Sequence, residues 1–418
     1  FSSKMNPPSG SGSYQVALTV LQTLRRSGFT TYFAGGCVRD MLMNRTPKDY
    51  DIATSASPGQ IMLHFPHTLD IGKAFGVIQV LMEGSSCEVA TFRKDRSYQD
   101  GRRPSTVEFC GAREDVLRRD FTINGLLYDP EKNEVIDYVE GRKDIEACVL
   151  RTIGPADARF GEDYLRMLRA VRLSSTLEFA IAPEALEAIR RQARNLERIS
   201  AERIQQEITR MLLEAPKPGH GIALLKEGGL LEVLLPEVAR MAGQQQPPLF
   251  HPEGDVLTHT INMLDGLKNP SLELAYAVLL HDVGKPLTAH SVQEPDGSQR
   301  IRFDGHAKAG ADLADAILRR LRLPAQATEI VTHCIRDHMR FMDVQFMRRS
   351  TLRQLIGSPT FPLELELHRL DCVYSHGDLS NHDFLLRFID ELKHEPVLPK
   401  PWITGKDLLE LGLQEGPD

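Results

Sequence analysis

The stretch 33-FAGGCVRDMLMNRTPKDYDIAT-54 packs a glycine pair, two arginines and three aspartates into one short run. Residues 31–35, which overlap its start, and residues 50–54 at its end have the apolar and β-branched content of short strands. Side chains two residues apart in a strand point to the same face, so Asp49 and Asp51 should present paired carboxylates toward one site.

Paired carboxylates on one face are suited to Mg²⁺, which can bridge triphosphate oxygens and activate an attacking hydroxyl group. Gly35 and Gly36 end the first strand and open a helix expected from Val38 to Met43, whose first N–H groups can cradle phosphates. Arg39 adds positive charge. An Asp-x-Asp pattern alone also arises in solvated turns of a chain with 57 acidic residues. The combination with the glycines indicates a nucleotide site.

The composition is that of an ordinary globular protein, with 41% hydrophobic and 26% charged residues, and 418 residues predict two or three domains. The net charge of -7 excludes a uniformly basic nucleic-acid binder, so any RNA should bind a local patch. No apolar run is long enough to span a membrane, and six scattered cysteines without a CxxC pair fit reduced thiols. We therefore expect a cytoplasmic protein with no membrane partner.

The pattern along the chain predicts an α+β head with a small mixed sheet, followed by all-α regions. The first all-α region is rich in arginine, and the second is rich in histidine. The final segment resembles one that continues further, so we expect the chain to be truncated after Asp418. The expected parts are a flexible leader 1–13, the head 14–151, a helical neck and body 152–242, a helical domain 243–398 and a C-terminal segment 399–418.

Several motifs in the first half stand in the order of a known family. They are 35-GGCVRD-40 with 48-KDYDIAT-54, 118-RRDFTINGL-126, 137-DYVEGRKDI-145, 159-RFGEDYLRMLRAVR-172 and 202-ERIQQE-207. Together they resemble the tRNA nucleotidyltransferases and poly(A) polymerases of the DNA polymerase beta superfamily, in the bacterial-type class (class II).

This resemblance implies that Asp49 and Asp51 are the catalytic ligands of Mg²⁺, with Glu88 as a third carboxylate. It also implies that three residues of the second motif contact the ribose and phosphates of the nucleotide; these are Arg119, Asp120 and Asn124. The charged segment 93–109 then corresponds to the flexible loop of enzymes that add the terminal A, and it is complete here.

A base-reading pair is expected in the segment 161–172. If that segment is helical, Asp163 and Arg166 share a face and can meet a nucleobase together. A carboxylate accepts from an exocyclic amine and a guanidinium donates to a ring nitrogen, which selects adenine and cytosine and rejects guanine and uracil. The alternative is an ordinary surface ion pair. Arg169 and Arg172 follow at helical spacing and are also expected to bind nucleotide.

The second half carries histidine and aspartate residues in helical contexts, in the order H…HD…H…H…D, and such residues suit divalent metals. This order resembles the HD-domain phosphohydrolases. The resemblance implies that these residues are metal ligands. His306 and His338 would either complete a second divalent metal position or contact the substrate. His333 is a rival to His338, and Lys285 is expected to stabilise phosphate charge. The six expected residues are His259, His281, Asp282, His306, His338 and Asp371.

We therefore expect a tRNA nucleotidyltransferase that adds CCA, or only its terminal A, to the 3′ end of the tRNA acceptor arm. It would use ATP with or without CTP and release pyrophosphate. Three alternatives remain: a poly(A) polymerase, an RNA-binding protein with vestigial sites, and a phosphohydrolase whose head only recruits RNA. The sequence leaves open the oligomeric state and the metal and activity of the histidine-rich domain.

Overall fold

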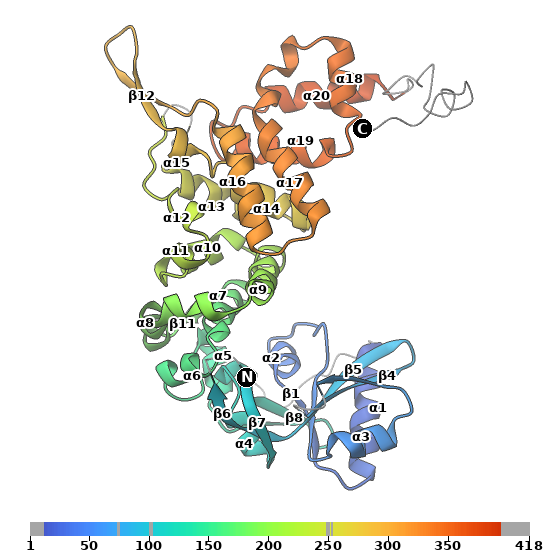
Figure 1. Ribbon diagram of the computed structural model, residues 1–418. Coiled ribbons are helices and arrows are strands. Elements are labelled where there is room, and N and C mark those ends of the chain that lie inside the picture. Colours follow the sequence, from blue (N-terminus) through green and yellow to red (C-terminus); the bar gives the residue numbers. More distant parts are fainter. Residues whose placement is uncertain (1–11, 73–75, 100–102, 248–250, 252–253, 394–418) are drawn as a thin grey trace, which may run out of the picture. The chain divides into compact units, whose positions relative to one another are not determined.

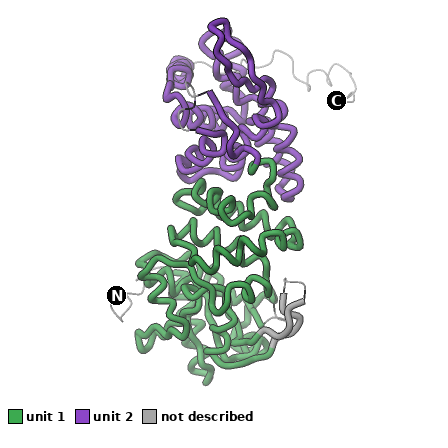
Figure 2. The backbone as a smooth tube through the Cα atoms, turned by 90° about the vertical axis from the view of Figure 1, so that its left-hand side faces the viewer, with its two compact units in different colours: residues 1–239 green, residues 240–418 purple. Residues whose placement is uncertain are grey.

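The computed structural model describes residues 12–72, 76–99, 103–247, 251 and 254–393. It divides into two compact units, Phe1–Ala239 and Arg240–Asp418 (Figure 2). The expected C-terminal segment lies outside the described residues, as does the leader except for its last two residues, which begin the first helix.

A mixed sheet of seven strands forms the centre of the head, in the order β3-β4-β5-β2-β1-β8-β9 (Figure 1). Strands β2 and β5 run parallel, whereas the other neighbours pair antiparallel. This confirms the expected α+β head. The strands are β1 Thr31–Ala34, β2 Ile52–Thr54, β3 Thr68–Gly72, β4 Val77–Met82, β5 Ser85–Thr91, β8 Leu126–Asp129 and β9 Glu134–Asp137.

Helix α1 (Gly12–Arg26) packs its apolar side against this sheet. Val16, Val20 and Leu24 are buried at a spacing of four residues, which defines one helical face. In the same core, Phe33 of β1 stacks between Tyr14 and Tyr128, and each buried aromatic ring contributes about 1.5–3 kcal/mol. This packing fixes strand β1 and thereby the glycine pair that follows it.

The other helices of the head connect the strands. They are α2 Gly36–Leu42, α3 Pro58–His64, α4 Ala112–Leu117, the 3₁₀ turn η2 Thr122–Asn124 and α5 Gly141–Glu146.

The segment 93–109 is a hairpin, although the sequence predicted a loop. Strand β6 (Arg93–Gln99) pairs antiparallel with β7 (Arg103–Phe109), and residues 100–102 between them lie outside the described residues. Strand β10 (Val149–Leu150) at the end of the head pairs in parallel with β11 (Ala180–Ile181).

The remainder of the first unit is mostly helical, but strand β11 within it was not part of the all-α expectation for residues 152–242. Its helices are α6 Ala156–Glu162, α7 Leu165–Leu177, α8 Pro183–Gln192, η3 Ala193–Arg198, α9 Ala201–Glu214, α10 Pro218–Glu227, α11 Leu231–Leu234 and α12 Pro236–Ala239. Helix α7 packs against both α9 and α10.

The second unit is mostly helical, but it also contains the antiparallel hairpin β12 (His290–Gln293) and β13 (Gln299–Arg302), so the all-α prediction was incomplete. No helix in the described ranges combines the length and the apolar content that a membrane crossing needs. The helices of the second unit are α13 Val256–Asp265, α14 Leu272–Leu280, α15 Lys285–Thr288, α16 His306–Arg320, α17 Ala325–Asp337, η4 His338–Phe346, α18 Arg349–Ile356, α19 Phe361–Val373 and α20 Ser380–Glu391.

Candidate active site and candidate metal centre

The parallel pairing of β2 with β5 brings a third carboxylate beside the two aspartates of the opening stretch. Ile52 pairs with Val89, so Asp51 lies beside Glu88 on the neighbouring strand. Tyr50 is 3% exposed, whereas the aspartates on either side of it are exposed. The strand begins two residues later than expected, but the alternation still presents both aspartates on one side.

All three carboxylates line one cavity of about 870 Å³, a volume in the range of small-ligand sites. Every nucleotide-binding residue expected from the sequence lines the same cavity. These residues are Gly35, Gly36, Arg39, Arg119, Asp120, Asn124, Asp163, Arg166, Arg169 and Arg172.

Asp51 occupies a poorly solvated position in the cavity wall although its side chain is exposed to the cavity. Desolvation by its surroundings, together with the charge of Glu88, raises the pKa of its carboxyl group to about 6, and Arg119 offsets part of that rise. Clustered carboxylates that repel one another in this way gain from a divalent cation between them. The residues present therefore fit a hard divalent metal.

Asp51→Asn should stabilise the metal-free protein at neutral pH. The pKa of the Asp51 carboxyl group is higher in the folded protein than in the unfolded chain. The free energy of unfolding of the wild type therefore falls as the pH rises from about 4 to about 6. With solvent screening, we expect the variant to recover about 1 kcal/mol, or about 2–4 °C in Tm.

Thermal melts in EDTA at about pH 7.5 and about pH 4.5 check this, and the gain should vanish at the lower pH. Mg²⁺ should then raise the Tm of the wild type more than that of the variant. A variant that melts below the wild type in EDTA at neutral pH would contradict the expectation.

The glycine pair permits a close approach of chain segments. Gly35 has a φ of +76°, and a Cβ atom there would lie 3.0 Å from Nη1 of Arg119. The N–H groups of Val38 and Arg39 both donate to the carbonyl of Gly35. The phosphate cradle at the start of α2 is therefore smaller than the sequence indicated.

Polar residues around η2 form one connected network. Nη1 of Arg39 donates to Oδ1 of Asn124 over 2.6 Å, and Nη2 of Arg169 lies 2.7 Å from Oδ2 of Asp120. Burial alone would raise the pKa of Asp120, but the guanidinium groups of Arg169 and Arg166 hold it below its ordinary value. These contacts orient the cavity-lining side chains before any ligand binds.

The expected continuous helix through the base-reading pair is wrong. Helix α6 ends at Glu162, and Asp163 has an extended backbone with φ of -143° before α7 begins. Arg166 donates from Nη1 to Glu162 and to the carbonyl of Arg159. Asp163 and Arg166 thus reach the same cavity from a helix junction and a helix, not from one helical face.

The arginines that follow on α7 differ in their surroundings. Arg169 is partly exposed, whereas Arg172 is buried and pairs with Glu207 of α9. Burial lowers the pKa of Arg172 although Glu207 acts against it. Arg172 thus also ties α7 to α9.

Sequence reasoning missed further cations that line the cavity and the carboxylate that holds one of them. Asp115 is 1% exposed and binds both Arg118 and Arg119 through its two oxygens. Its spacing of three and four residues before these arginines on a short helix was the signal available. The missed cations in the cavity wall are Arg45, Lys48, Arg93, Arg118 and Arg210.

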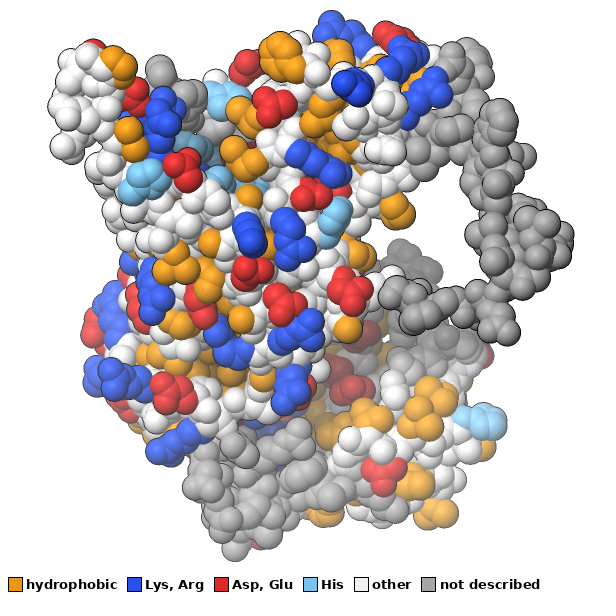
Figure 3. All heavy atoms as spheres, turned by 45° about the horizontal axis from the view of Figure 1, so that its top comes forward, with side chains coloured by type: hydrophobic (Ala, Val, Ile, Leu, Met, Phe, Trp, Pro, Cys, Tyr) orange, Lys and Arg blue, Asp and Glu red, His pale blue; other side chains and the backbone are white. Residues whose placement is uncertain are grey.

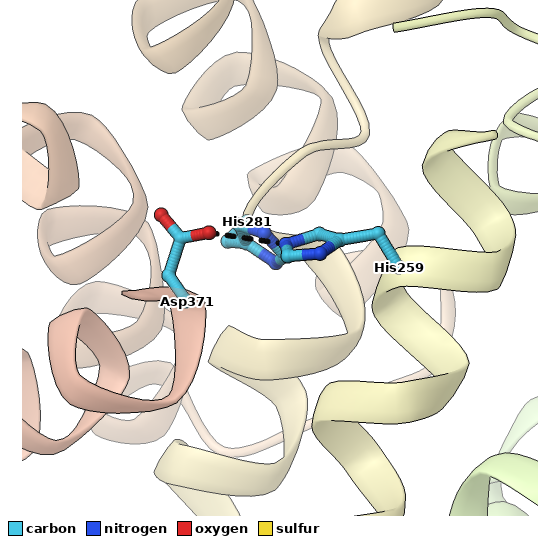
Figure 4. Close-up of side chains that lie close together, drawn as sticks. All are labelled: His259, His281 and Asp371. Carbon is cyan, nitrogen blue, oxygen red and sulfur yellow. Dashed lines mark hydrogen bonds and ion pairs between the residues drawn. The ribbon is translucent and has the colours of Figure 1, made fainter. Parts of the chain in front are cut away.

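In the second unit, the six expected histidine and aspartate residues form two adjoining groups. His259, His281 and Asp371 make up one group, and the ligand atoms of each group lie within 4.8 Å of one another (Figure 4). Nε2 of His259 lies 3.0 Å from Oδ1 of Asp371. The second group consists of Asp282, His306 and His338.

The four histidine rings make the same kind of contact with the backbone. Each Nδ1 atom lies within hydrogen-bond distance of a backbone carbonyl, which can only accept, so Nδ1 carries the proton and Nε2 offers a lone pair in the neutral ring. Nε2 of His306 and Nε2 of His338 lie only 3.3 Å apart. Two lone pairs so close repel each other unless a cation lies between them. The contacts of the Nδ1 atoms with backbone carbonyls are of the kind that orients histidine ligands toward a metal. The cluster therefore fits a divalent metal.

The charges of this cluster favour the metal-binding protonation states. Burial lowers the pKa of His338 to about 4 and also lowers that of His306. Burial would raise the pKa of Asp282, but His281 and Lys285 hold it well below its ordinary value. At neutral pH the imidazoles of His306 and His338 are then neutral and the carboxylate of Asp282 is ionised, as metal ligation requires.

Residues beyond the six expected ligands lie against this centre; Lys285 was expected there, whereas Gln246 and His251 were not. Nζ of Lys285 lies 2.7 Å from Oδ2 of Asp282 and donates to Oε1 of the buried Gln246. The ring of His251 lies 5.0 Å from that of His259. His333, the rival to His338, instead lies beside Glu364 and belongs to neither group.

Three protein families match successive parts of the chain. Residues 31–151 match the poly A polymerase head domain, 178–241 the probable RNA and SrmB-binding site of polymerase A, and 256–373 the HD domain.

Curated relatives are CCA-adding enzymes. That of Geobacillus thermodenitrificans is 45% identical over 227 residues, and that of Lactobacillus johnsonii is 42% identical over 241 residues. These matches cover 54% and 57% of the chain and 54% and 59% of the relatives. The chain thus matches little more than half the length of these relatives.

Solved structures extend the likeness along the chain. The Bacillus stearothermophilus CCA-adding enzyme in complex with CTP has a TM-score of 0.72 and 29% identity, covering 98% of this chain and 90% of that one. The Thermotoga maritima CCA-adding enzyme complexed with tRNA shares the fold, with a TM-score of 0.60 and 18% identity over 98% of this chain and 89% of that one. The chain therefore carries, in this order, a poly A polymerase head domain, an RNA-binding region of polymerase A and a C-terminal HD domain, and it is similar to CCA-adding enzymes.

Proposed function

We propose that the chain is a template-independent tRNA nucleotidyltransferase that adds CCA to tRNA 3′ ends from CTP and ATP. The observation that carries this proposal is the single cavity lined by Asp49, Asp51 and Glu88 together with Asp163 and Arg166. The names of the relatives support CCA as the product, with the terminal A as its last step. The corresponding parts are a head at 14–151, a neck and body at 152–242 and an HD domain at 243–398.

Asp49 and Asp51, with Glu88 beside them, would hold Mg²⁺, which when bound neutralises triphosphate charge and activates the RNA 3′-hydroxyl group. The remaining work belongs to the cations of the cavity. Arg39 and Arg119 line the cavity and would hold the triphosphate so that its α-phosphorus faces the attacking oxygen and pyrophosphate leaves. Asn124 positions Arg39 through their hydrogen bond.

The base is selected by the edge that it presents to Asp163 and Arg166. Cytosine and adenine each offer an amine beside a ring acceptor, so the carboxylate accepts and the guanidinium donates. Uracil and guanine offer a carbonyl beside an N–H group, which leaves both protein groups unpaired.

Asp163→Ala and Arg166→Ala should relax the rejection of UTP and GTP and weaken the use of CTP and ATP. Each lost contact is worth about 1–3 kcal/mol. The measurement is kcat/KM for each NTP supplied singly to tRNA that ends at the discriminator base or in CC, with sequencing of the 3′ ends. Arg151→Ala, which loses ion pairs with Asp144 and Glu184 outside the cavity, is the control. Unchanged selectivity among the four NTPs would refute this reading of the base edge.

The same assay separates the alternatives. A poly(A) polymerase would add an unfixed number of A residues, and a binding protein with vestigial sites would add none. A phosphohydrolase with a recruiting head would bind RNA without extending it.

Several arginines of the neck are paired with carboxylates, so the basic surface that the neck offers to tRNA is smaller than the number of its arginines suggests. Arg190 pairs with Glu187 and Glu227, and Arg191 pairs with Asp157. On the face shown in Figure 3, basic and acidic side chains of the described residues are interspersed. Such pairing leaves RNA contact to local groups of cations, which include those of the cavity.

A second candidate function is metal-dependent phosphoester hydrolysis by the HD domain. The inward Nε2 lone pairs and the carboxylates Asp282 and Asp371 would hold one or two divalent ions, which when bound supply a hydroxide nucleophile. Lys285 is placed to stabilise the charge of a phosphate.

A further inference from the structure

Arg203 of helix α9 contacts the base-reading carboxylate from outside the cavity. Its Nη2 atom donates to Oδ2 of Asp163 over 3.1 Å, and the side chains are 27% and 16% exposed. Among the described residues that line the cavity, Asp163 is present and Arg203 is not. Asp163 therefore links Arg203 to the cavity.

Asp163 needs such support because it lies at a break between two helices. Its backbone is extended, so the regular helical lattice that the sequence predicted does not fix its side chain. Oδ1 accepts from the backbone N–H of Leu165 over 3.1 Å, and Oδ2 accepts from Arg203. Each oxygen keeps one more lone pair, which can accept from the exocyclic amine of a base.

We propose that Arg203 is a positioning residue that sets nucleotide selectivity by fixing the carboxylate of Asp163 against the base edge. The proposal rests on the proposed function of this cavity. Without the guanidinium, the carboxylate keeps its contact with Leu165 but can rotate about its terminal bond. It would then discriminate less sharply between an amine and a carbonyl group.

A purely structural link between α9 and the helix junction is the competing explanation. The α9 helix is already tied to α7 one turn further on, where Glu207 pairs with the buried Arg172. Loss of Arg203 therefore leaves an anchor between the helices in place. A structural role would lower stability and all four rates together, whereas a positioning role changes their ratio.

The test compares Arg203→Ala, Arg203→Lys, Asp163→Ala and the double variant, with Arg151→Ala as the control. We expect Arg203→Ala to reduce the preference for CTP over UTP by about 5- to 20-fold, mainly through a higher KM for CTP. Arg203→Lys keeps the charge and should recover part of the preference. In the Asp163→Ala background, removal of Arg203 should change the preference by less than about twofold, because both act through one contact.

The outcomes distinguish this proposal from the one on which it depends. No incorporation by the wild type would overturn the proposed function. Altered selectivity in Asp163→Ala but not in Arg203→Ala would overturn the positioning role alone. Additive effects in the double variant, or an equal loss of rate with all four NTPs in Arg203→Ala, would assign Arg203 a structural role.

Discussion

Asp51→Ala is expected to abolish nucleotide incorporation, and Asp49→Ala to do the same, while the head remains folded. Removal of a metal ligand forfeits several kcal/mol of transition-state stabilisation, or on the order of 10³-fold or more in rate. The fold should tolerate the change because both side chains are exposed, and because desolvation and the charge of Glu88, which raise the pKa of Asp51, make its ionised carboxylate unfavourable. Single-turnover incorporation of CTP and ATP into tRNA, with a thermal melt of each variant, measures both effects.

Glu134→Ala provides the matched control, because Glu134 is an exposed acidic residue of the same sheet that does not line the cavity. It should retain incorporation within about twofold of the wild type, as surface substitutions usually do. Near-normal incorporation by both aspartate variants would remove the proposed active site. Loss of activity accompanied by a lower Tm would point to misfolding instead.

Local sequence was sufficient to predict those site residues that lie close together along the chain. The glycine pair, Asp49 and Asp51 could be assigned to one site because strand alternation acts over two residues. The presence of Glu88 beside Asp51 depends on the parallel pairing of β2 with β5, which spacing along the chain does not reveal. Only the family resemblance indicated that third carboxylate.

The base-reading pair shows the opposite case. Spacing predicted that Asp163 and Arg166 share a helical face, but the chain breaks between α6 and α7. The side chain of Asp163 accepts a hydrogen bond from Arg203, which lies 40 residues further along the chain. Long-range ion pairs of this kind depend on tertiary packing, so no local pattern encodes them.

The HD domain lies between these cases. The order of its histidines and aspartates predicted that six residues converge, and the structure brings them together. Their division into two groups was not predictable, because it depends on how α13, α16, α17 and α19 pack. The same packing excludes His333, which spacing could not separate from His338.

His281→Ala is expected to remove bound metal from the HD domain and to abolish its phosphoester hydrolysis, while nucleotide addition persists. Its Nε2 atom is buried without a hydrogen-bond partner among the described residues, although Oδ2 of Asp282 lies 3.2 Å away. A buried imidazole nitrogen without a partner is costly unless a cation satisfies it, whereas Oδ2 of Asp282 already lies against Nζ of Lys285. Asp282→Ala should have the same effect, and each loss should be about 100-fold or more.

Retained Ni²⁺, Mn²⁺, Co²⁺ or Mg²⁺ is measured by elemental analysis, and hydrolysis is measured on 2′,3′-cyclic nucleotides and phosphomonoesters. His333→Ala is the control, because this half-exposed histidine lies outside both groups. Since burial lowers the pKa of His338 to about 4, protonation of this residue should not compete with the metal at neutral pH. If the wild type retains no metal and all variants share one background rate, the HD domain is a scaffold. If hydrolysis alone is lost in His281→Ala, the chain carries two separable active sites.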